Sequence, residues 1–375
     1  MTTKLRVGII FGGKSGEHEI SLASAQSVAR AMDREKYNVV MIGVTKQGRW
    51  VAGENVLQQL IAASPSLLLK PGNGAPIEQI ESLNSKDLVP TMASNASPLG
   101  AIDVAFPLIH GPLGEDGTVQ GLLELADIPY VGAGVAASAV GMDKQLMKAI
   151  FRAQGLPVLD WMVVLRRDWQ AQPEETIRRI EAAFGYPCFV KPANLGSSVG
   201  VSKAHNWDEL AQALATAAQY DRKLLAERAA LNAREIECSV LGNDDPIASL
   251  PGEVAPHREF YDYTAKYDAT AQTDLIVPAD LPAETARAVQ AIAVRAFQAI
   301  DCSGMARVDF FVERATNKIF LNEINTIPGF TAVSMYPRMW EKSGLAYPAL
   351  IDRLIQLALE RAADKQKSKT SYEPK

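Results

Sequence analysis

Residues 305–329 contain two apolar segments separated by a short polar turn, Glu313 to Lys318. Such a pattern predicts two neighbouring strands that form a hairpin. Glu323 and Asn325 stand two residues apart in the second strand, so their side chains share one face. Asp309 in the first strand can meet them on that face. The chain is therefore expected to contain a hairpin with a cluster of oxygen-bearing side chains.

This cluster has the composition of a magnesium site. Two carboxylates and an amide, from Asp309, Glu323 and Asn325, suit Mg²⁺, which keeps waters and phosphate oxygens as further ligands. Arg307 stands two residues before Asp309, so it faces the same site and adds positive charge. An acidic cluster beside an arginine favours phosphoryl transfer from a metal-bound nucleotide. A hairpin with a solvated acidic face is the alternative interpretation.

The length and charge of the chain limit its class. With 375 residues it can form two or three domains, and its 47% hydrophobic and 22% charged residues are ordinary for a globular enzyme. The net charge of -5 argues against nucleic acid as a partner. Cys188, Cys238 and Cys302 have no metal-type spacing and fit buried thiols in a reducing compartment.

No segment predicts a membrane span, because no apolar run is long enough. The apolar segment Leu5–Phe11 follows two basic residues, as in a signal peptide. Lys14 and Glu17 follow it at once, however, so a first β-strand is the better interpretation. We therefore expect a cytoplasmic protein without a membrane partner.

The N-terminal part predicts a β-α-β unit and a parallel sheet, with a strand at 5–11, a helix at 17–32 and a strand at 37–44. Residues 50–100 are rich in Ser, Pro, Asn and Gly and predict an irregular excursion. Further strands are expected at 102–109, 188–191, 224–227 and 235–241, and helices at 118–126, 143–154, 207–219, 283–300 and 347–363.

Residues Gly8–Ser15 match the phosphate-binding Walker A pattern literally. We interpret the match as accidental, because a phosphate loop must curl around its anion, whereas Ile9, Ile10 and Phe11 have the character of strand core. The loop still ends a strand and opens a helix, where parallel α/β sheets bind small ligands. Glu17 at the helix start could anchor a substrate ammonium group or complement the helix dipole.

A second glycine-rich loop, Gly196–Gly200, is a stronger phosphate-binding candidate. A predicted strand delivers Lys191 to this loop, which contains Ser197 and Ser198. Backbone N–H groups and hydroxyls of such a loop can surround phosphates. An ordinary flexible turn is the alternative, but the lysine before the loop and the downstream metal cluster favour phosphate binding.

Several motifs follow one another along almost the whole chain. They are Phe11-Gly-Gly-Lys-Ser-Gly-Glu-His-Glu-Ile-Ser21, His110-Gly-Pro-Leu-Gly-Glu-Asp-Gly117, Met142-Asp-Lys144, Lys191-Pro-Ala-Asn-Leu-Gly-Ser-Ser-Val-Gly200, Arg234-Glu-Ile-Glu237, Phe260-Tyr-Asp-Tyr-Thr-Ala-Lys-Tyr267 and Asn322-Glu-Ile-Asn-Thr-Ile-Pro-Gly-Phe-Thr331. In this order they resemble the D-alanine–D-alanine ligase family of the ATP-grasp superfamily. Residues 50–100 carry no such motif.

The resemblance implies an α/β fold of three domains. An N-terminal parallel α/β domain that binds substrate would span residues 1–132. Two α+β domains, a central one at 133–226 and a C-terminal metal-binding one at 227–363, would hold ATP between two antiparallel sheets. Residues 364–375 would form a disordered tail.

The resemblance also implies an ATP site. Its residues would be Lys144, Lys191, Ser198, Glu227, Glu235 and Lys266. Lys144 and Lys191 would contact phosphates, Glu227 would lie by the adenine and Glu235 would bind the ribose. The register between Glu227 and Glu235 is open in the sequence. The three metal ligands of the hairpin would hold two Mg²⁺ ions, which Mn²⁺ can replace.

For the amino-acid substrates, the resemblance implies that Glu17 holds the ammonium group of the first D-alanine, with His110 nearby. Ser334 and Lys266 would contact the second D-alanine. The residues implied in catalysis are Glu17, Ser197, Arg307, Tyr267 and Gly329. Arg307 and the backbone N–H near Gly329 would form the oxyanion hole, and Tyr267 would bond to Ser197, which reaches Glu17.

The expected reaction proceeds through an acylphosphate, formed by attack of the first D-alanine's carboxylate on ATP. The amine of the second D-alanine then displaces phosphate. A lid formed by residues 196–200 and 259–271 would exclude water. The partners would be D-alanine, ATP and a second copy of the chain in a homodimer.

Three alternatives remain. A D-alanine–D-lactate or D-alanine–D-serine ligase would use the same first step, and Lys266 and Tyr267 argue against the D-lactate type. An ATP-binding regulatory protein without catalysis would lack a metal ligand or Arg307, but all are present. A Walker-type NTPase would need Lys14.

Overall fold

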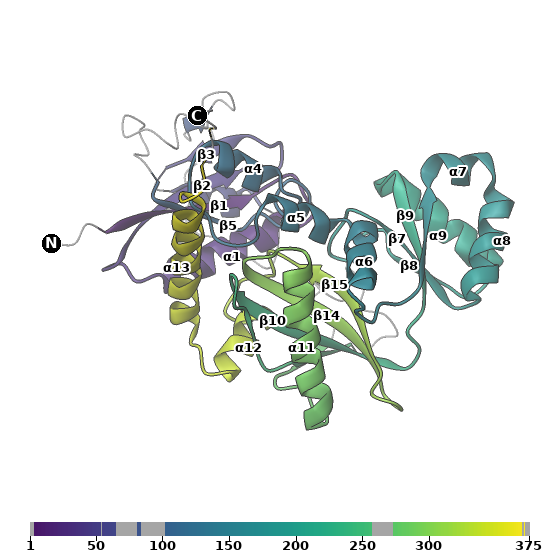
Figure 1. Ribbon diagram of the computed structural model, residues 1–375. Coiled ribbons are helices and arrows are strands. Elements are labelled where there is room, and N and C mark those ends of the chain that lie inside the picture. Colours follow the sequence, from purple (N-terminus) through teal and green to yellow (C-terminus); the bar gives the residue numbers. More distant parts are fainter. Residues whose placement is uncertain are drawn as a thin grey trace, which may run out of the picture.

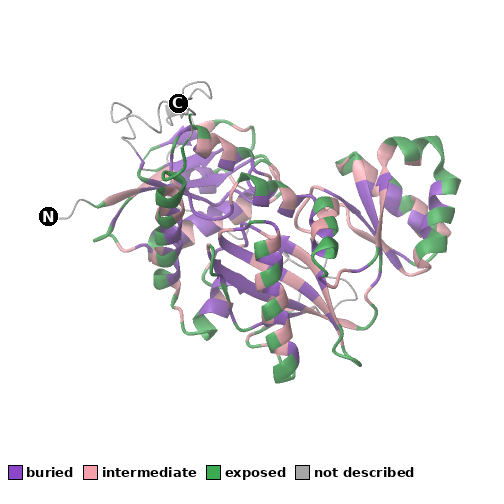
Figure 2. Cartoon of the chain, viewed as in Figure 1, coloured by how far each residue is buried: buried purple, intermediate pink, exposed green. Residues whose placement is uncertain are grey.

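The computed structural model describes residues 4–53, 55–64, 81–83, 102–256, 273–369 and 371. Three β-sheets follow one another through the molecule, each with helices packed on it (Figure 1). Buried residues concentrate in the sheets and on the helix faces turned toward them, whereas the outer helix faces are exposed (Figure 2). No helix of the described part of the chain is long and apolar enough to cross a membrane.

The first sheet has the strand order β4-β3-β2-β1-β5. Its strands are β1 (Leu5–Gly12), β2 (Tyr37–Val44), β3 (Trp50–Ala52), β4 (Glu81–Leu83) and β5 (Val104–Pro107). Strands β2, β1 and β5 run parallel, and β3 and β4 add antiparallel pairings on the other side of β2. The predicted parallel pairing is therefore confirmed for these three strands.

Helices cover both faces of this sheet. They are α1 (His18–Ala31), α2 (Val56–Ala62), α4 (Thr118–Leu125) and the C-terminal α13 (Tyr347–Lys365). Side chains alternate along β1, so Ile9 packs into the core beneath α1 and α13, whereas Ile10 packs with α4 on the other face. The C-terminal helix thus completes the N-terminal core, with Leu354 among its buried residues.

The second sheet is antiparallel and carries the predicted hairpin. Its order is β13-β12-β10-β14-β15, with β11 paired to β10. The strands are β10 (Ala233–Gly242), β11 (Ile247–Ala248), β12 (Gly252–Pro256), β13 (Thr273–Ile276), β14 (Gly304–Glu313) and β15 (Ile319–Asn325). Its apolar core involves α5 (Val135–Met142), α6 (Lys144–Ala153) and α11 (Ala283–Ala299).

A β-bulge decides which side chains of β15 face the site. Asp309 pairs with Glu323, but the next residue of β14, Phe310, pairs with Leu321, so Asn322 is the extra residue. Without the bulge, Leu321 and Glu323 would share a face. With it, Leu321 enters the apolar core and Glu323 leaves it.

The third sheet is also antiparallel and has the order β6-β9-β7-β8. Its strands are β6 (Trp161–Leu165), β7 (Cys188–Pro192), β8 (Ser202–Ala204) and β9 (Lys223–Arg228). Helices α7 (Arg166–Ala171), α8 (Pro173–Phe184) and α9 (Trp207–Tyr220) flank it (Figure 1). Helix α6 lies between this sheet and the second one (Figure 1).

The predicted strands and helices are all present, with ends shifted by a few residues. Others were not predicted, including α5, α8 and α12 (Met335–Lys342). The expected disordered tail was placed too early, because α13 continues through Asp364 and Lys365. Strand β9 ends at Arg228, two residues beyond the expected domain boundary at 226. All three cysteines are buried and free, as predicted.

Candidate active site

Glu17 and Ser197 meet across two sheets. Glu17 immediately precedes α1 of the first sheet, and Ser197 lies in the glycine-rich loop after β7 of the third. The hydroxyl of Ser197 donates a hydrogen bond to Oε1 of Glu17. This bond brings the predicted substrate anchor to the predicted phosphate loop.

Two glycines make room for the Glu17 carboxylate. A Cβ on Gly111 would stand 2.7 Å from Oε2 of Glu17, and one on Gly196 would stand 3.1 Å from it. Gly111 also has a positive φ of 75°, which a larger residue rarely adopts. The carboxylate is therefore enclosed by backbone, which favours a small ligand group at this position.

His110 and Glu115 lie buried beside this carboxylate. His110 Nδ1 is 2.9 Å from the carbonyl oxygen of Ile327, and Nε2 is 3.2 Å from Oγ of Ser24. Burial lowers the pKa of His110 despite the nearby Glu17 charge, so the neutral ring is favoured. Glu115 Oε2 accepts a hydrogen bond from the N–H of Gly111 at 2.7 Å.

The acidic row of the second sheet extends over three strands. Glu237 of β10 pairs with Asp309 of β14, and Asp309 pairs with Glu323 of β15. Asn325 pairs with Arg307, and its Oδ1 accepts a hydrogen bond from the N–H of Ile327 at 3.1 Å. The structure thus brings the three predicted metal ligands and Arg307 together.

Arg307 neutralises part of this row. Its Nε and Nη2 donate to the two oxygens of Asp309, both at 2.7 Å, and Nε lies 3.2 Å from Oε2 of Glu237. Burial alone would lower the pKa of Arg307, but these carboxylates outweigh it and raise the pKa well above its usual value. The guanidinium is therefore a permanent charge inside the site.

Two carboxylates and one amide oxygen form a donor set that fits a hard cation. Among the residues that the structure describes, no three His, Cys, Asp or Glu side chains are grouped to hold a metal ion. A divalent ion at Asp309 would compete with Arg307 for the same two oxygens. Lys144 Nζ lies 3.5 Å from Oε2 of Glu323, so this carboxylate also has a positive neighbour.

Lys144 and Lys191 approach the site from different elements. Lys144 begins α6, whose N-terminus is capped by the Asp143 side chain. Its Nζ donates to the carbonyl oxygen of Leu195 at 2.8 Å, which ties the helix to the glycine-rich loop. Lys191 on β7 contacts the carboxylate of Glu227 on β9. Both lysines are largely buried.

Lys148 joins Lys191 at the same carboxylate. It is fully buried on α6, and its Nζ contacts Oε1 of Glu227. Burial would raise the pKa of Glu227, but the two lysine charges outweigh it and lower the pKa. The adenine-side residue expected from the family is therefore an ionised carboxylate between two lysines.

Ser334 lies close to Gly329, as the predicted second-substrate region requires. A Cβ on Gly329 would stand 3.3 Å from Oγ of Ser334. This hydroxyl also lies 2.7 Å from Oγ1 of Thr331 and accepts a hydrogen bond from the N–H of Thr331 at 3.1 Å.

Two further predicted nucleotide-binding residues lie on other elements. Glu235 stands two residues from Glu237 on β10. In the phosphate loop, Ser198 has a left-handed backbone with φ of 57°.

Two predicted residues, Lys266 and Tyr267, lie outside the described part of the chain, as does the segment 259–271 expected to form part of the lid. Lys14 is exposed, and its side chain lies against Gly48, whereas Ile9 and Phe11 are fully buried in β1. The interpretation of 9–11 as strand core is therefore confirmed, and the Walker A match is accidental.

Sequence reasoning gave no individual role to Glu115, Lys148 or Glu237. Glu115 and Glu237 are inside motifs that were recognised only as strings. Lys148 follows Lys144 by four residues, so both extend from one side of α6. That spacing, on a helix whose Met147 and Phe151 are buried, is the signal that could have identified Lys148.

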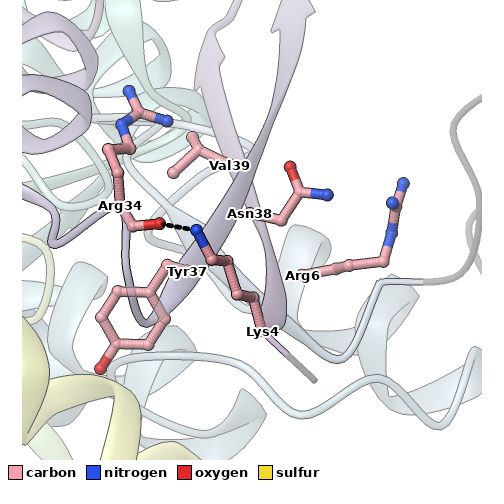
Figure 3. A pocket seen from close by; sticks show the side chains of 6 residues that line it. All are labelled: Lys4, Arg6, Arg34, Tyr37, Asn38 and Val39. Atoms are coloured by element: carbon pink, nitrogen blue, oxygen red, sulfur yellow. Dashed lines mark hydrogen bonds between the residues drawn. The ribbon is translucent and has the colours of Figure 1, made fainter. Parts of the chain in front are cut away.

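A separate hollow of about 570 Å³ lies at the amino ends of β1 and β2 (Figure 3). It is lined by Lys4, Arg6, Arg34, Tyr37, Asn38 and Val39. Lys4 Nζ donates to the carbonyl oxygen of Arg34 at 2.7 Å and lies 3.8 Å from the carboxylate of Glu35. The hollow is at the opposite end of β1 from the loop that leads to Glu17.

Comparison with known proteins covers nearly the whole chain. Residues 6–133 match the family model of the D-ala D-ala ligase N-terminus, and residues 150–356 match that of the D-ala D-ala ligase C-terminus. The D-alanine–D-alanine ligase of Heliobacterium modesticaldum is 48% identical over 372 residues, covering 99% of each chain. The ligase of Acetivibrio thermocellus is 49% identical over 374 residues, covering 98% of this chain and 99% of its own.

Solved structures agree with these matches. The D-alanine–D-alanine ligase of Coxiella burnetii superposes with a TM-score of 0.79 at 40% identity, covering 97% of this chain and 96% of its own. The VanG D-Ala:D-Ser ligase of Enterococcus faecalis superposes with a TM-score of 0.80 at 32% identity, covering 95% of this chain and 100% of its own. The mixed α/β architecture with several sheets is therefore shared with ligases of the ATP-grasp type.

Proposed function

The chain belongs to the D-alanine–D-alanine ligase family, and from this premise we propose how its own residues carry out the reaction. It uses ATP to join two D-alanine molecules and releases ADP and phosphate. The D-alanyl-D-alanine product serves peptidoglycan precursor synthesis. The hydrogen bond between Ser197 and Glu17 is the observation that carries the proposal, because it connects the substrate anchor to the phosphate loop.

In the first step, the carboxylate of one D-alanine attacks the γ-phosphorus of ATP, and ADP leaves. Glu17 holds the ammonium group of this D-alanine, and the neutral His110 lies nearby. Lys144, Lys191 and the loop hydroxyl of Ser198 bind the phosphates. Preorganised positive charge at a transferring phosphoryl group is the main contribution that a protein makes to such a step.

In the second step, the neutral amine of the other D-alanine attacks the carbonyl carbon of D-alanyl phosphate, and phosphate leaves. Arg307 and the backbone N–H near Gly329 stabilise the oxyanion. Ser334 and Lys266 contact the second D-alanine. Tyr267 bonds to Ser197 and so ties the lid to Glu17. The position of Ser334, whose Oγ would lie 3.3 Å from a Cβ on Gly329, supports this placement.

The nucleotide lies between the two antiparallel sheets, with Glu227 by the adenine and Glu235 at the ribose. Asp309, Glu323 and Asn325 hold two Mg²⁺ ions, and Mn²⁺ can replace them. The metal supplies positive charge that offsets the charge of the phosphates. The pairing of Asp309 with Glu323 across β14 and β15 supports this assignment.

We propose a division into domains at 1–132, 133–226 and 227–363; the presence of three sheets supports three units, although β9 runs two residues past 226. Helix α6 and strands β6, β7 and β8 then belong to the central domain, and the last residues of β9 cross its boundary. We further propose that the enzyme acts in the cytoplasm, where ATP is made, and that two copies form a homodimer. Analytical ultracentrifugation tests the homodimer.

The reaction is tested by phosphate release with ATP, Mg²⁺ and a panel of amino acids. D-Alanine should give D-alanyl-D-alanine, whereas L-alanine should give no turnover. The panel includes D-serine and D-lactate, because the VanG relative is a D-Ala:D-Ser ligase of the same fold. Turnover with L-amino acids alone would contradict the proposed substrate site.

A further inference from the structure

Glu227 is a buried carboxylate with one lysine at each oxygen. Lys148 of α6 contacts Oε1, and Lys191 of β7 contacts Oε2. The side chain of Lys148 is 0% exposed and that of Glu227 is 3% exposed. Three charged groups from three elements are therefore enclosed together, and their formal charges leave one positive charge in excess.

Such an arrangement has a cost in the empty protein. Burial lowers the pKa of Lys148; the Glu227 carboxylate and then the more distant Glu323 oppose that effect, whereas the Lys191 charge adds to it. One carboxylate can balance one lysine, so the second buried lysine lacks an equal opposite charge within this trio. The excess charge favours the arrival of an anion, and the lysine that can meet it is the one nearer the solvent.

The two lysines differ in how far their side chains are exposed to solvent. The side chain of Lys191 is 10% exposed and lies on β7, the strand that leads to the glycine-rich loop, whereas the side chain of Lys148 is 0% exposed. The neighbours of Lys148 on α6, Met147 and Phe151, are anchored in the core of the second sheet. Lys148 is thus held in place, while Lys191 lies at the side from which a phosphate would enter.

We propose that Lys148 is a positioning residue for the nucleotide, because it remains paired with Glu227 and so releases Lys191 to bind phosphate. Without Lys148, a bound phosphate and the buried Glu227 would compete for Lys191. This inference rests on the proposed ATP site. It assigns Lys148 an effect on nucleotide affinity through Glu227, without contact to ATP.

The test is a double-mutant cycle on the full-length protein. Equilibrium titration with ADP in the presence of Mg²⁺ is compared for the wild type, Lys148→Met, Glu227→Gln and the double variant. Lys148→Met should weaken ADP binding about tenfold, which corresponds to about 1.4 kcal/mol. The double variant should bind as Glu227→Gln does, because Lys191 no longer faces a buried carboxylate.

Two further variants serve as controls. Lys148→Arg keeps the charge and should bind ADP within about threefold of the wild type, a difference of less than 1 kcal/mol. Lys36→Met removes a lysine paired with Asp352 beside the first sheet and should leave ADP affinity unchanged. At saturating ATP, the rate of Lys148→Met should depend on D-alanine concentration in the same way as the rate of the wild type.

Two results would overturn the inference. One is wild-type ADP affinity in Lys148→Met, and the other is weaker binding by the double variant than by Glu227→Gln. If Lys148→Met fails to fold, the second comparison still decides, because both of its variants carry a neutral glutamine at position 227, so that Lys191 has no buried carboxylate to face. A wild-type protein that does not bind ADP would instead overturn the ATP site itself.

Discussion

Ser197 donates a hydrogen bond to the carboxylate of Glu17, although 180 residues separate the two in the chain. One residue lies in the loop after β7, and the other lies at the start of α1. The contact joins the phosphate loop of the third sheet to the ligand-binding end of the first. Closure of the loop and occupation of the substrate anchor are therefore expected to be coupled.

Glu17→Gln should weaken the use of the first D-alanine while leaving ADP binding intact. A hydrogen bond to a charged group contributes about 1.5–3 kcal/mol, so kcat/KM for D-alanine should fall roughly 10–150-fold. Steady-state phosphate release provides the measurement. Glu19→Gln on the same helix, where Glu19 pairs with Lys46, is the matched control and should retain activity.

Glu323→Gln should remove most activity without unfolding the protein. The change removes charge from the metal site, and the Glu323 side chain, which is 29% exposed and contacts Lys144 at 3.5 Å, lies outside the apolar core. Because loss of outer-shell residues already costs about 10–100-fold, loss of a ligand should cost at least about a hundredfold. Initial rates and thermal melts are compared with those of Lys14→Ala, which should stay active because Lys14 is exposed. An inactive Lys14→Ala beside an active Glu323→Gln would contradict both assignments.

Arg307→Ala should impair turnover while ADP still binds. Loss of one oxyanion donor costs about 3–4 kcal/mol in the barrier, which is roughly a 10²–10³-fold loss of kcat. Single-turnover rates and ADP titration separate the chemical step from binding. Arg307→Lys should recover only part of the rate, because a lysine cannot donate two parallel bonds to Asp309. Normal turnover combined with weak ADP binding would instead make Arg307 a phosphate clamp.

The Tm of Glu115→Gln, relative to that of the wild type, should increase as pH rises. Burial first, and then the Glu17 charge, raise the Glu115 pKa well above its usual 4.5. The folded state therefore binds this proton more tightly than the unfolded state does. The resulting stability is fully present below about pH 4.5 and is lost as pH rises through the folded pKa. Gln mimics the neutral acid, so its advantage in Tm should be larger at pH 8 than at pH 5. A difference in Tm that is constant with pH would contradict an elevated pKa.

Tyr267→Phe should raise ester formation relative to dipeptide formation when D-alanine and D-lactate are mixed. The substitution keeps the ring but removes the proposed bond to Ser197. The effect should be largest at low pH, where the D-alanine amine stays protonated while the D-lactate hydroxyl has no ammonium proton to lose. Product analysis across pH measures the ratio. An unchanged ratio at every pH would leave Tyr267 with a packing role alone.

Local sequence patterns predicted the elements that carry the site. Two apolar segments around a polar turn predicted the hairpin of residues 305–325, and alternating strands and helices predicted the parallel part of the first sheet. The prediction that the side chains of Glu323 and Asn325 share one face was also correct. Local patterns did not predict α12. Its Tyr336 and Trp340 are buried in the core that α13 shares, so this helix depends on packing with distant parts of the chain.

By itself, the sequence determined the strand and helix periods, the glycine-rich loops and the types of side chain available for metal, phosphate and substrate. These depend on residues near one another in the chain. Only the tertiary structure decided the contact of Ser197 with Glu17, the bulge that turns Glu323 out of the core, and the enclosure of Glu227 by Lys148 and Lys191. Each depends on how separate sheets and helices pack, and the energy of a buried charge is set by that packing.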